Sequence, residues 1–207
     1  MLRVGLTGGL ASGKSFVGKA LADLGCHLIQ ADELGHEVLM PGAEAYEAVV
    51  GEFGSGVLAP DGTVDRSRLA AEVFDRPERL AKLNSLVHPP VIRREEKILG
   101  DLEARDPGGI AVMEAAILIE TGSYRRFDKI IVVVATREQQ VERAMGRGLS
   151  REEALARIDR QMPLEEKRKF ADYVIDTSGQ KEDTLRQVGE VYRELAGTAA
   201  PGRSVSQ

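Results

Sequence analysis

The clearest chemical signal in the chain lies at residues 8–15, which read G-x-x-x-x-G-K-S. In this pattern the glycines let the backbone wrap closely around a phosphate, so that loop N–H groups and a helix N-terminus face the anion. The lysine reaches the β- and γ-phosphates of a nucleoside triphosphate, and the serine hydroxyl holds Mg²⁺. We therefore predict a binding site for ATP or GTP. Its residues are Gly8, Gly9, Ala11, Ser12, Gly13, Lys14, Ser15 and Phe16.

Asp32 is a candidate for the acceptor side of a phosphoryl transfer. It follows a short apolar segment and directly precedes an amphipathic helical pattern. A carboxylate at the end of a strand near the phosphate loop can orient an acceptor hydroxyl and take its proton. Aspartate directly before a helix is also a preferred N-cap. The two roles are compatible, and sequence position alone leaves both open.

Glu114 interrupts the apolar run Ile110–Ile119. A carboxylate in a buried strand is costly unless it is paired or serves a cation. Because a phosphate loop is expected in the same sheet, we favour a carboxylate that acts on Mg²⁺ together with Ser15. A structural partner for a nearby lysine or arginine is the alternative.

Two arginines, Arg143 and Arg147, are four residues apart and therefore share one face of a predicted helix at residues 138–145. Together they could clamp a triphosphate and offset negative charge in the transition state. For either arginine alone, an ion pair on a solvated helix face is the simpler interpretation. His88 precedes two prolines between two helical patterns, and the residues alone do not assign it a role.

The elements that must position these residues form an alternating pattern. Five apolar runs predict buried strands at residues 2–7, 27–31, 110–116, 129–134 and 173–175, and helical patterns separate them. This order is typical of an α/β fold with a doubly wound five-stranded parallel sheet, whose ligand binds at the carboxyl ends of the strands. We assign residues 1–40, 106–136 and 171–196 to this nucleotide-binding core.

Two insertions interrupt the core. Residues 41–105 carry several helical patterns and no convincing strand, which predicts an α-helical substrate-binding domain. Residues 137–170 are rich in charged and amide side chains, which predicts a mobile helical lid. The small and polar tail at residues 197–207 is expected to be disordered.

Composition narrows the function classes. A net charge of −5 over 207 residues disfavours a general nucleic-acid binder, and no apolar run approaches the length of a membrane span. The single cysteine excludes an internal disulfide and fits a reducing cytoplasm. A GTPase needs a guanine-reading N-K-x-D segment, and the only asparagine, Asn84, does not lie in one. A small ATP-dependent kinase fits best.

Several segments together resemble the dephospho-coenzyme A kinase family, over residues 2–192. Besides the phosphate loop, they are Ala31-Asp32 with His36, Val64-Asp65-Arg66, Val73-Phe74, Leu83-Asn84, Val87-His88-Pro89, Glu114–Glu120, Gln140–Arg143, Arg157–Pro163 and Ala171–Asp176. Each is a weak signal alone, but their order and spacing are specific. The chain departs from the family pattern at Gln30, where an aspartate is common, and at Phe16, where a threonine is common.

The resemblance implies transfer of the γ-phosphoryl group of ATP to the ribose 3′-hydroxyl of dephospho-CoA, the last step of coenzyme A synthesis. Asp32 would then be the catalytic base, Lys14 the phosphate ligand, and Arg143 and Arg147 catalytic contacts from the lid. The substrate site would include Asp32, His36, His88 and Glu114. A cytoplasmic enzyme that is a monomer or a weak homo-oligomer, with no nucleic-acid or membrane partner, is expected. The alternatives are another small-molecule or nucleoside kinase and an ATP-binding regulator without turnover.

Overall fold

The computed structural model describes residues 1–199 and divides the chain into two compact units. Of the described residues, one unit contains 1–30 and 102–199, and the other contains 31–101. Each unit has its own apolar core. None of the helices in residues 1–199 is long and apolar enough to cross a membrane.

The first unit is built on a five-stranded sheet with the order β2-β3-β1-β4-β5, and every neighbouring pair is parallel. The strands are β1 (Leu2–Gly8), β2 (His27–Gln30), β3 (Ile110–Glu114), β4 (Lys129–Val134) and β5 (Tyr173–Asp176). The predicted doubly wound parallel sheet is confirmed. The chain crosses from β1 to β2 on one side of β1 and later from β3 to β4 on its other side. The connections therefore diverge between β1 and β3, which is where such folds bind their ligands.

Alternate residues of β4 pack into different cores, because successive side chains of a strand point to opposite faces. Ile131 and Val133 join the core that also contains residues of α1 (Lys14–Asp23) and α9 (Lys181–Ala199). Ile130 and Val132 join the core on the other face, with Leu118. Both faces of the strand are buried, which explains its unbroken apolar sequence.

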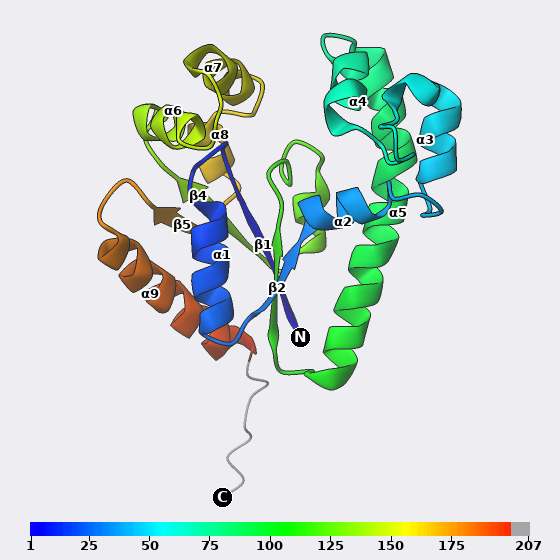
Figure 1. Cartoon of the computed structure of the whole chain (residues 1–207). Coiled ribbons are helices and arrows are strands. Elements are labelled where there is room, and N and C mark those ends of the chain that lie inside the picture. The colour runs from blue at the N-terminus through cyan, green and yellow to red at the C-terminus, as the bar shows by residue number, and fades with distance from the viewer. Residues whose placement is uncertain (200–207) are drawn as a thin grey trace, which may run out of the picture. The chain divides into compact units, whose positions relative to one another are not determined.

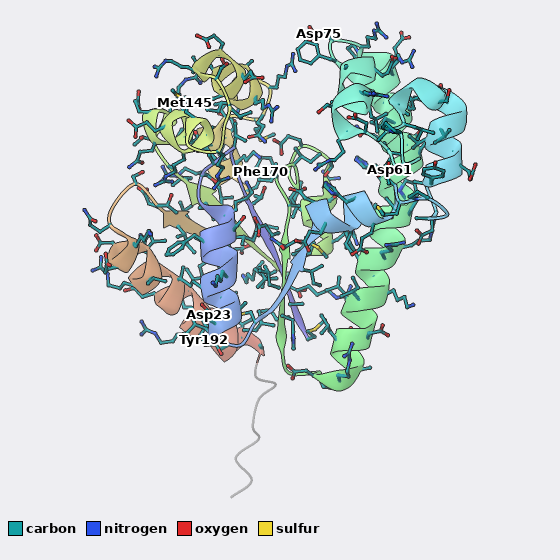
Figure 2. The ribbon with its side chains drawn as sticks, viewed as in Figure 1. Asp23, Asp61, Asp75, Met145, Phe170 and Tyr192 are labelled. Carbon is teal, nitrogen blue, oxygen red and sulfur yellow. The ribbon has the colours of Figure 1, made fainter. Side chains whose placement is uncertain are left out.

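Helices α1 and α9 lie on one face of this sheet (Figure 1), and Leu164 packs into the core on the other face. Helix α9 packs beside α1, and Figure 2 places Tyr192 of α9 near Asp23 at the end of α1. Helices α6 (Arg137–Met145), α7 (Arg151–Asp159) and α8 (Leu164–Arg168) stand at the carboxyl end of the strands, and a short 3₁₀ turn, η2 (Ser123–Arg126), precedes β4. Residues 197–199 of the expected tail belong to α9, and residues 200–207 lie outside the described part of the chain.

The second unit is helical. Its elements are α2 (Ala31–Glu37), α3 (Tyr46–Phe53), η1 (Ser55–Val57), α4 (Arg66–Val73) and α5 (Pro77–Arg105), whose last turn extends into the first unit. Val38, Val49, Phe53 and Leu69 form its core with partly buried residues of α5. The only β pairing in it is an isolated bridge between Leu58 and Val64.

Helix α5 corrects the prediction of two helices separated at His88. It runs unbroken for 29 residues with Pro89 and Pro90 inside it. Two prolines remove two backbone donors and usually end a helix. Here Leu83, Leu86, Val87 and Val91 on both sides of the prolines pack against the same core, so tertiary packing holds one helix together. His88 is thus a helical residue, not a linker residue.

Candidate active site

The phosphate loop occupies the turn between β1 and α1, at the carboxyl end of the central strand. Its shape depends on three glycines. A Cβ at Gly8 would collide with the Val133 carbonyl oxygen, and one at Gly9 would collide with Gln140 Nε2. Gly13 has a φ of 95° and precedes the first residue of α1, a conformation that other residues rarely adopt. The loop therefore needs glycine at two positions for close packing and at the third for its backbone conformation.

Lys14 and Ser12 place two polar side-chain groups in the phosphate loop. The Lys14 ammonium donates a hydrogen bond of 3.0 Å to the Gly9 carbonyl, which holds it over the loop. The Ser12 hydroxyl oxygen is buried and has no hydrogen-bond partner among residues 1–199. The first N–H groups of α1 have no acceptor within the helix, as at every helix start, and the helix dipole favours an anion in front of them.

Ser15 of α1 and Glu114 of β3 are in contact. The Ser15 hydroxyl donates to Glu114 Oε1 at 2.8 Å. The second oxygen, Oε2, is buried without a partner in the described residues, and Gly18 lies beside it, since a Cβ there would be 3.3 Å away. A buried carboxylate oxygen without a partner beside a serine hydroxyl fits a hard cation such as Mg²⁺. No group of three carboxylate, histidine or cysteine residues in residues 1–199 could hold a metal alone, so such an ion would depend on further ligands such as phosphate or water.

Arg143 reaches back from α6 to the end of β5. Its guanidinium donates to the Thr177 hydroxyl at 2.9 Å and to the Thr177 carbonyl at 2.7 Å. The Thr177 hydroxyl in turn donates to the Ser12 carbonyl at 2.7 Å. Arg143 is therefore linked to the phosphate loop through one residue. Arg147 is exposed beyond the end of α6 and does not join this network.

A second polar link comes from Lys167 of α8, whose side chain is fully buried. Its ammonium donates to the Ala116 carbonyl at 2.7 Å and the Gly8 carbonyl at 3.5 Å, and pairs with Glu120 at 2.9 Å. Glu120 also accepts from the Met162 backbone N–H at 3.2 Å. Sequence reasoning missed Lys167, because lysine is rarely buried and nothing in its local pattern distinguishes it.

Gln140 and Gln161 lie in two of the segments that carry the family resemblance, but the sequence analysis assigned neither a role. The Gln140 amide donates to the Leu10 carbonyl, and the Gln161 amide oxygen accepts from the Leu10 N–H, each at 2.7 Å. Both side chains line a cavity of about 400 Å³ together with Gly9, Arg137 and Asp159. Arg137 and Asp159 form an ion pair of 2.6 Å. The cavity therefore joins the phosphate loop to the segment between β4 and β5.

The remaining predicted residues, Asp32, His36 and His88, belong to the second unit. Asp32 lies in the first turn of α2, which directly follows β2 in the chain, and His36 lies in the last turn. Both are exposed, and His88 is half-buried in α5. Asp32 is inside the helix and not at its N-cap, so the capping interpretation is wrong. A carboxylate in a first helical turn is still stabilised by the helix dipole.

Helix α2 is anchored within its unit by Arg94 of α5. The Arg94 guanidinium donates to both carboxylate oxygens of Glu44, at 2.9 and 2.6 Å, and to Glu37 at the end of α2 at 2.7 Å. The hydrogen bond from Arg94 lowers the pKa of Glu44 from 4.5 to about 2. These contacts connect the helix that carries Asp32 and His36 to α5.

Comparisons with known proteins agree on one family. The sequence pattern of the family described as dephospho-CoA kinase matches residues 2–183. Dephospho-CoA kinase from Aquifex aeolicus is 44% identical over 195 residues, which cover 94% of this chain and 98% of that protein. The enzyme from Carboxydothermus hydrogenoformans is 45% identical, over 89% of this chain and 90% of that protein.

Two solved structures match almost the whole chain. TT1252 from Thermus thermophilus has a TM-score of 0.80 at 38% identity and covers 94% of this chain and 97% of its own. Dephospho-CoA kinase from Campylobacter jejuni has a TM-score of 0.71 at 28% identity, over 96% of this chain and 98% of its own. The sequence match, the parallel sheet and the phosphate loop after its central strand lead to one conclusion: the chain belongs to the dephospho-CoA kinase family.

Proposed function

We propose that the chain transfers the γ-phosphoryl group of ATP to the ribose 3′-hydroxyl of dephospho-CoA and so makes coenzyme A and ADP. Membership of the family supports the reaction. One observation carries the assignment of the site: the Ser15 hydroxyl and Glu114 Oε1 lie 2.8 Å apart at the phosphate loop, and Glu114 Oε2 is buried with no partner among residues 1–199.

The phosphate side of the reaction belongs to the phosphate loop. The N–H groups at the start of α1 and the Lys14 ammonium would bind the β- and γ-phosphates, and Ser12 supplies a buried hydroxyl without a partner in residues 1–199. Ser15 and Glu114 would hold Mg²⁺, which neutralises charge on the phosphates when bound. We assign the binding of ATP to the eight residues predicted for it, which are all of residues 8–16 except Leu10.

On the acceptor side, Asp32 would accept the proton of the 3′-hydroxyl as that oxygen bonds to the γ-phosphorus. The bond from the γ-phosphorus to the β–γ bridging oxygen breaks, and ADP leaves with the electron pair. In a loose phosphoryl transfer the proton moves late, so the carboxylate chiefly orients the hydroxyl. His36 and His88 would bind the acceptor, and residues 41–105 would form most of its binding domain.

Arg143 and Arg147 would balance the negative charge that moves toward the leaving ADP. The bonds from Arg143 to Thr177 place its guanidinium one residue from the phosphate loop, which supports this role. The exposed Arg147 would contribute only when residues 137–170 close over the nucleotide as a lid. Such closure excludes water from a reaction that water would otherwise compete for.

The experiment that tests the function measures coenzyme A and ADP in parallel. Purified protein with ATP and Mg²⁺ should release ADP only when dephospho-CoA is added, with coenzyme A formed in equal amount. Reactions with AMP, nucleosides or no acceptor are the controls. ADP formed only with one of those acceptors would replace the substrate, and ATP binding without any turnover would point to a regulator.

The role of Asp32 is tested by Asp32→Asn, which keeps the size of the side chain but removes its basicity. We expect kcat to fall by about 10²–10⁴-fold. The dissociation constant of ATP should stay within about twofold, because Asp32 faces the acceptor. Glu33→Gln, on the next residue of the same helical turn, is the matched control. A variant Asp32→Asn with normal turnover would reduce Asp32 to a helix-start charge.

We also propose that the enzyme works in the cytoplasm, as a monomer or a weak homo-oligomer and without a nucleic-acid partner. The buried single cysteine and the negative net charge support this. Light scattering across a range of protein concentrations measures the oligomeric state directly.

A further inference from the structure

The backbone of Leu10, in the middle of the phosphate loop, is held on both sides by amides from a distant part of the chain. Its N–H donates to Gln161 Oε1 and its carbonyl accepts from Gln140 Nε2, both at 2.7 Å. The two glutamines are 151 and 130 residues away from Leu10 in sequence. Gln140 lies on α6 and Gln161 lies between α7 and α8, so both belong to the segment that connects β4 to β5. We call these two residues the Leu10 clamp.

Backbone chemistry determines which end of each amide faces Leu10. A backbone N–H can only donate, so Gln161 must present its oxygen. A backbone carbonyl can only accept, so Gln140 must present its NH₂ group. The two glutamines therefore make hydrogen bonds of opposite polarity to the two peptide groups of a single residue. This makes their contributions separable by substitution.

The clamp supports a part of the loop that needs support. Ala11, the next residue, has a φ of 52°, which is uncommon for a residue with a side chain. An unfavourable backbone conformation of this kind persists only where its surroundings hold it. The residue before Leu10, Gly9, leaves space for the Gln140 amide, because a Cβ there would collide with Gln140 Nε2. Gln140 is also only 4% exposed, so it has little freedom to turn away.

We infer that Gln140 and Gln161 are positioning residues that hold the phosphate loop in its phosphate-binding shape, and that they couple residues 137–170 to nucleotide affinity. The inference rests on the proposed function in one respect, since it takes the loop to bind ATP. Leu10 is not among the residues assigned to ATP, and both of its peptide groups are bonded to the glutamines, so the clamp acts on the nucleotide through the shape of the loop. A displacement of α6 or of the α7–α8 connection that breaks these bonds therefore weakens ATP binding without removing any group that touches it.

The test compares two isosteric substitutions that add the same charge. Gln140→Glu places a carboxylate oxygen against the Leu10 carbonyl, where a donor is needed. Gln161→Glu keeps an acceptor for the Leu10 N–H. The dissociation constant of ATP is measured by calorimetry without acceptor, and the unfolding temperature of each variant is measured without nucleotide. We expect Gln140→Glu to raise the dissociation constant about tenfold more than Gln161→Glu does, because only the first loses its hydrogen bond.

A third variant removes the acceptor without adding charge. Gln161→Met should weaken ATP binding relative to wild type. At high salt, which screens the charge added by Gln161→Glu, Gln161→Met should also bind ATP more weakly than Gln161→Glu does. Equal effects of Gln140→Glu and Gln161→Glu would show that charge matters and hydrogen-bond polarity does not. That result, or normal ATP affinity in all three folded variants, would overturn the inference.

The two proposals fail in different ways. ATP binding is measured without dephospho-CoA, so the clamp is tested even if the acceptor is wrong. A wild-type protein that binds ATP but makes no coenzyme A would overturn the proposed reaction only. A wild-type protein that makes coenzyme A, together with variants of unchanged ATP affinity, would overturn the clamp only.

Discussion

A single buried charge shows how much one residue can organise. Lys167 has three ammonium donors, and the structure gives each an acceptor: the Ala116 carbonyl, the Gly8 carbonyl and the Glu120 carboxylate. These acceptors belong to the exit of β3, the start of the phosphate loop and the segment after β3. A buried ammonium is tolerated only when its donors are satisfied in this way.

We predict that Lys167→Met destabilises the protein by about 1–3 kcal/mol, because the substitution keeps much of the volume but leaves buried acceptors without a donor. Urea denaturation followed by circular dichroism measures the change. Lys169→Met is the matched control, since Lys169 is exposed and, within the described part of the chain, pairs only with Glu166 three residues earlier. A loss of equal size in both variants would show that burial of the ammonium is unimportant.

At the scale of elements, α6 and α7 begin with the same device. The side-chain oxygens of Thr136 and Ser150 each accept from the backbone N–H three residues later. The side chains of Gln139 and Glu153 each accept from the backbone N–H of the cap residue. Such capping boxes define a helix start within a polar segment. They explain why a segment low in large apolar residues still forms two short helices that carry Arg143 and lead to Gln161.

Removing one cap should loosen its helix by a predictable amount. We expect Ser150→Ala to cost about 1 kcal/mol of stability, from the loss of the bond to the Glu153 N–H. Ser67→Ala, at an exposed position inside α4 that caps no helix, should change stability by less than about 0.5 kcal/mol. Urea denaturation provides both values. Indistinguishable results for the two variants would contradict the role of the cap.

The ion pairs of Arg94 give the second unit a pH-dependent contribution. The pKa of Glu44 is lowered to about 2 by the hydrogen bond from Arg94. A carboxylate whose pKa is lower in the folded state stabilises that state above its unfolded pKa, and the effect is lost as the pH falls through the folded pKa. For Glu44 this window extends from its ordinary pKa of 4.5 down to about 2.

We therefore predict a pH-dependent difference between wild type and Glu44→Gln. The difference in free energy of unfolding should be fully present near neutral pH and should shrink steadily as the pH falls below the ordinary pKa of glutamate. Urea denaturation at a series of pH values measures it. Glu47→Gln is the control, on an exposed glutamate in the first turn of α3. A difference that stays constant down to acidic pH would show that the pair with Arg94 adds no stability.

At the scale of the whole molecule, Cys26 reports on the opening of the main core. It is 6% exposed, packs with residues of the sheet, α1 and α9, and burial raises the pKa of its thiol to about 11. Only a thiolate reacts readily with alkylating agents, and the buried thiol is both protonated and inaccessible. Since it is the only cysteine in the chain, its labelling follows a single event.

We predict that native protein resists iodoacetamide at about pH 8, whereas unfolded protein is labelled completely. ATP with Mg²⁺ should slow native labelling further, because a ligand that binds only the folded state stabilises it. Mass spectrometry measures the labelled fraction over time. Rapid labelling of the native protein would contradict the burial of Cys26, and labelling that ATP leaves unchanged would show that the core opens without losing the nucleotide site.

Much of this protein follows from the sequence alone. The phosphate loop depends on glycines, a lysine and a serine within eight residues, and five apolar runs predict the five strands because burial on both faces needs unbroken apolar sequence. The family follows from the order of several such local patterns. All of these signals lie within short stretches of chain, where backbone preferences and side-chain spacing act directly.

Only the tertiary structure decided the contacts that hold the site together. The Leu10 clamp, the buried Lys167 and the bond from Arg143 to Thr177 each join residues that are tens of positions or more apart, and glutamine, lysine or threonine gives no local sign of its partner. The prolines of α5 suggested a break that packing on both sides prevents. Local sequence sets which conformations are cheap, and the packing of distant segments selects among them, because burial free energy exceeds the propensity of any single residue.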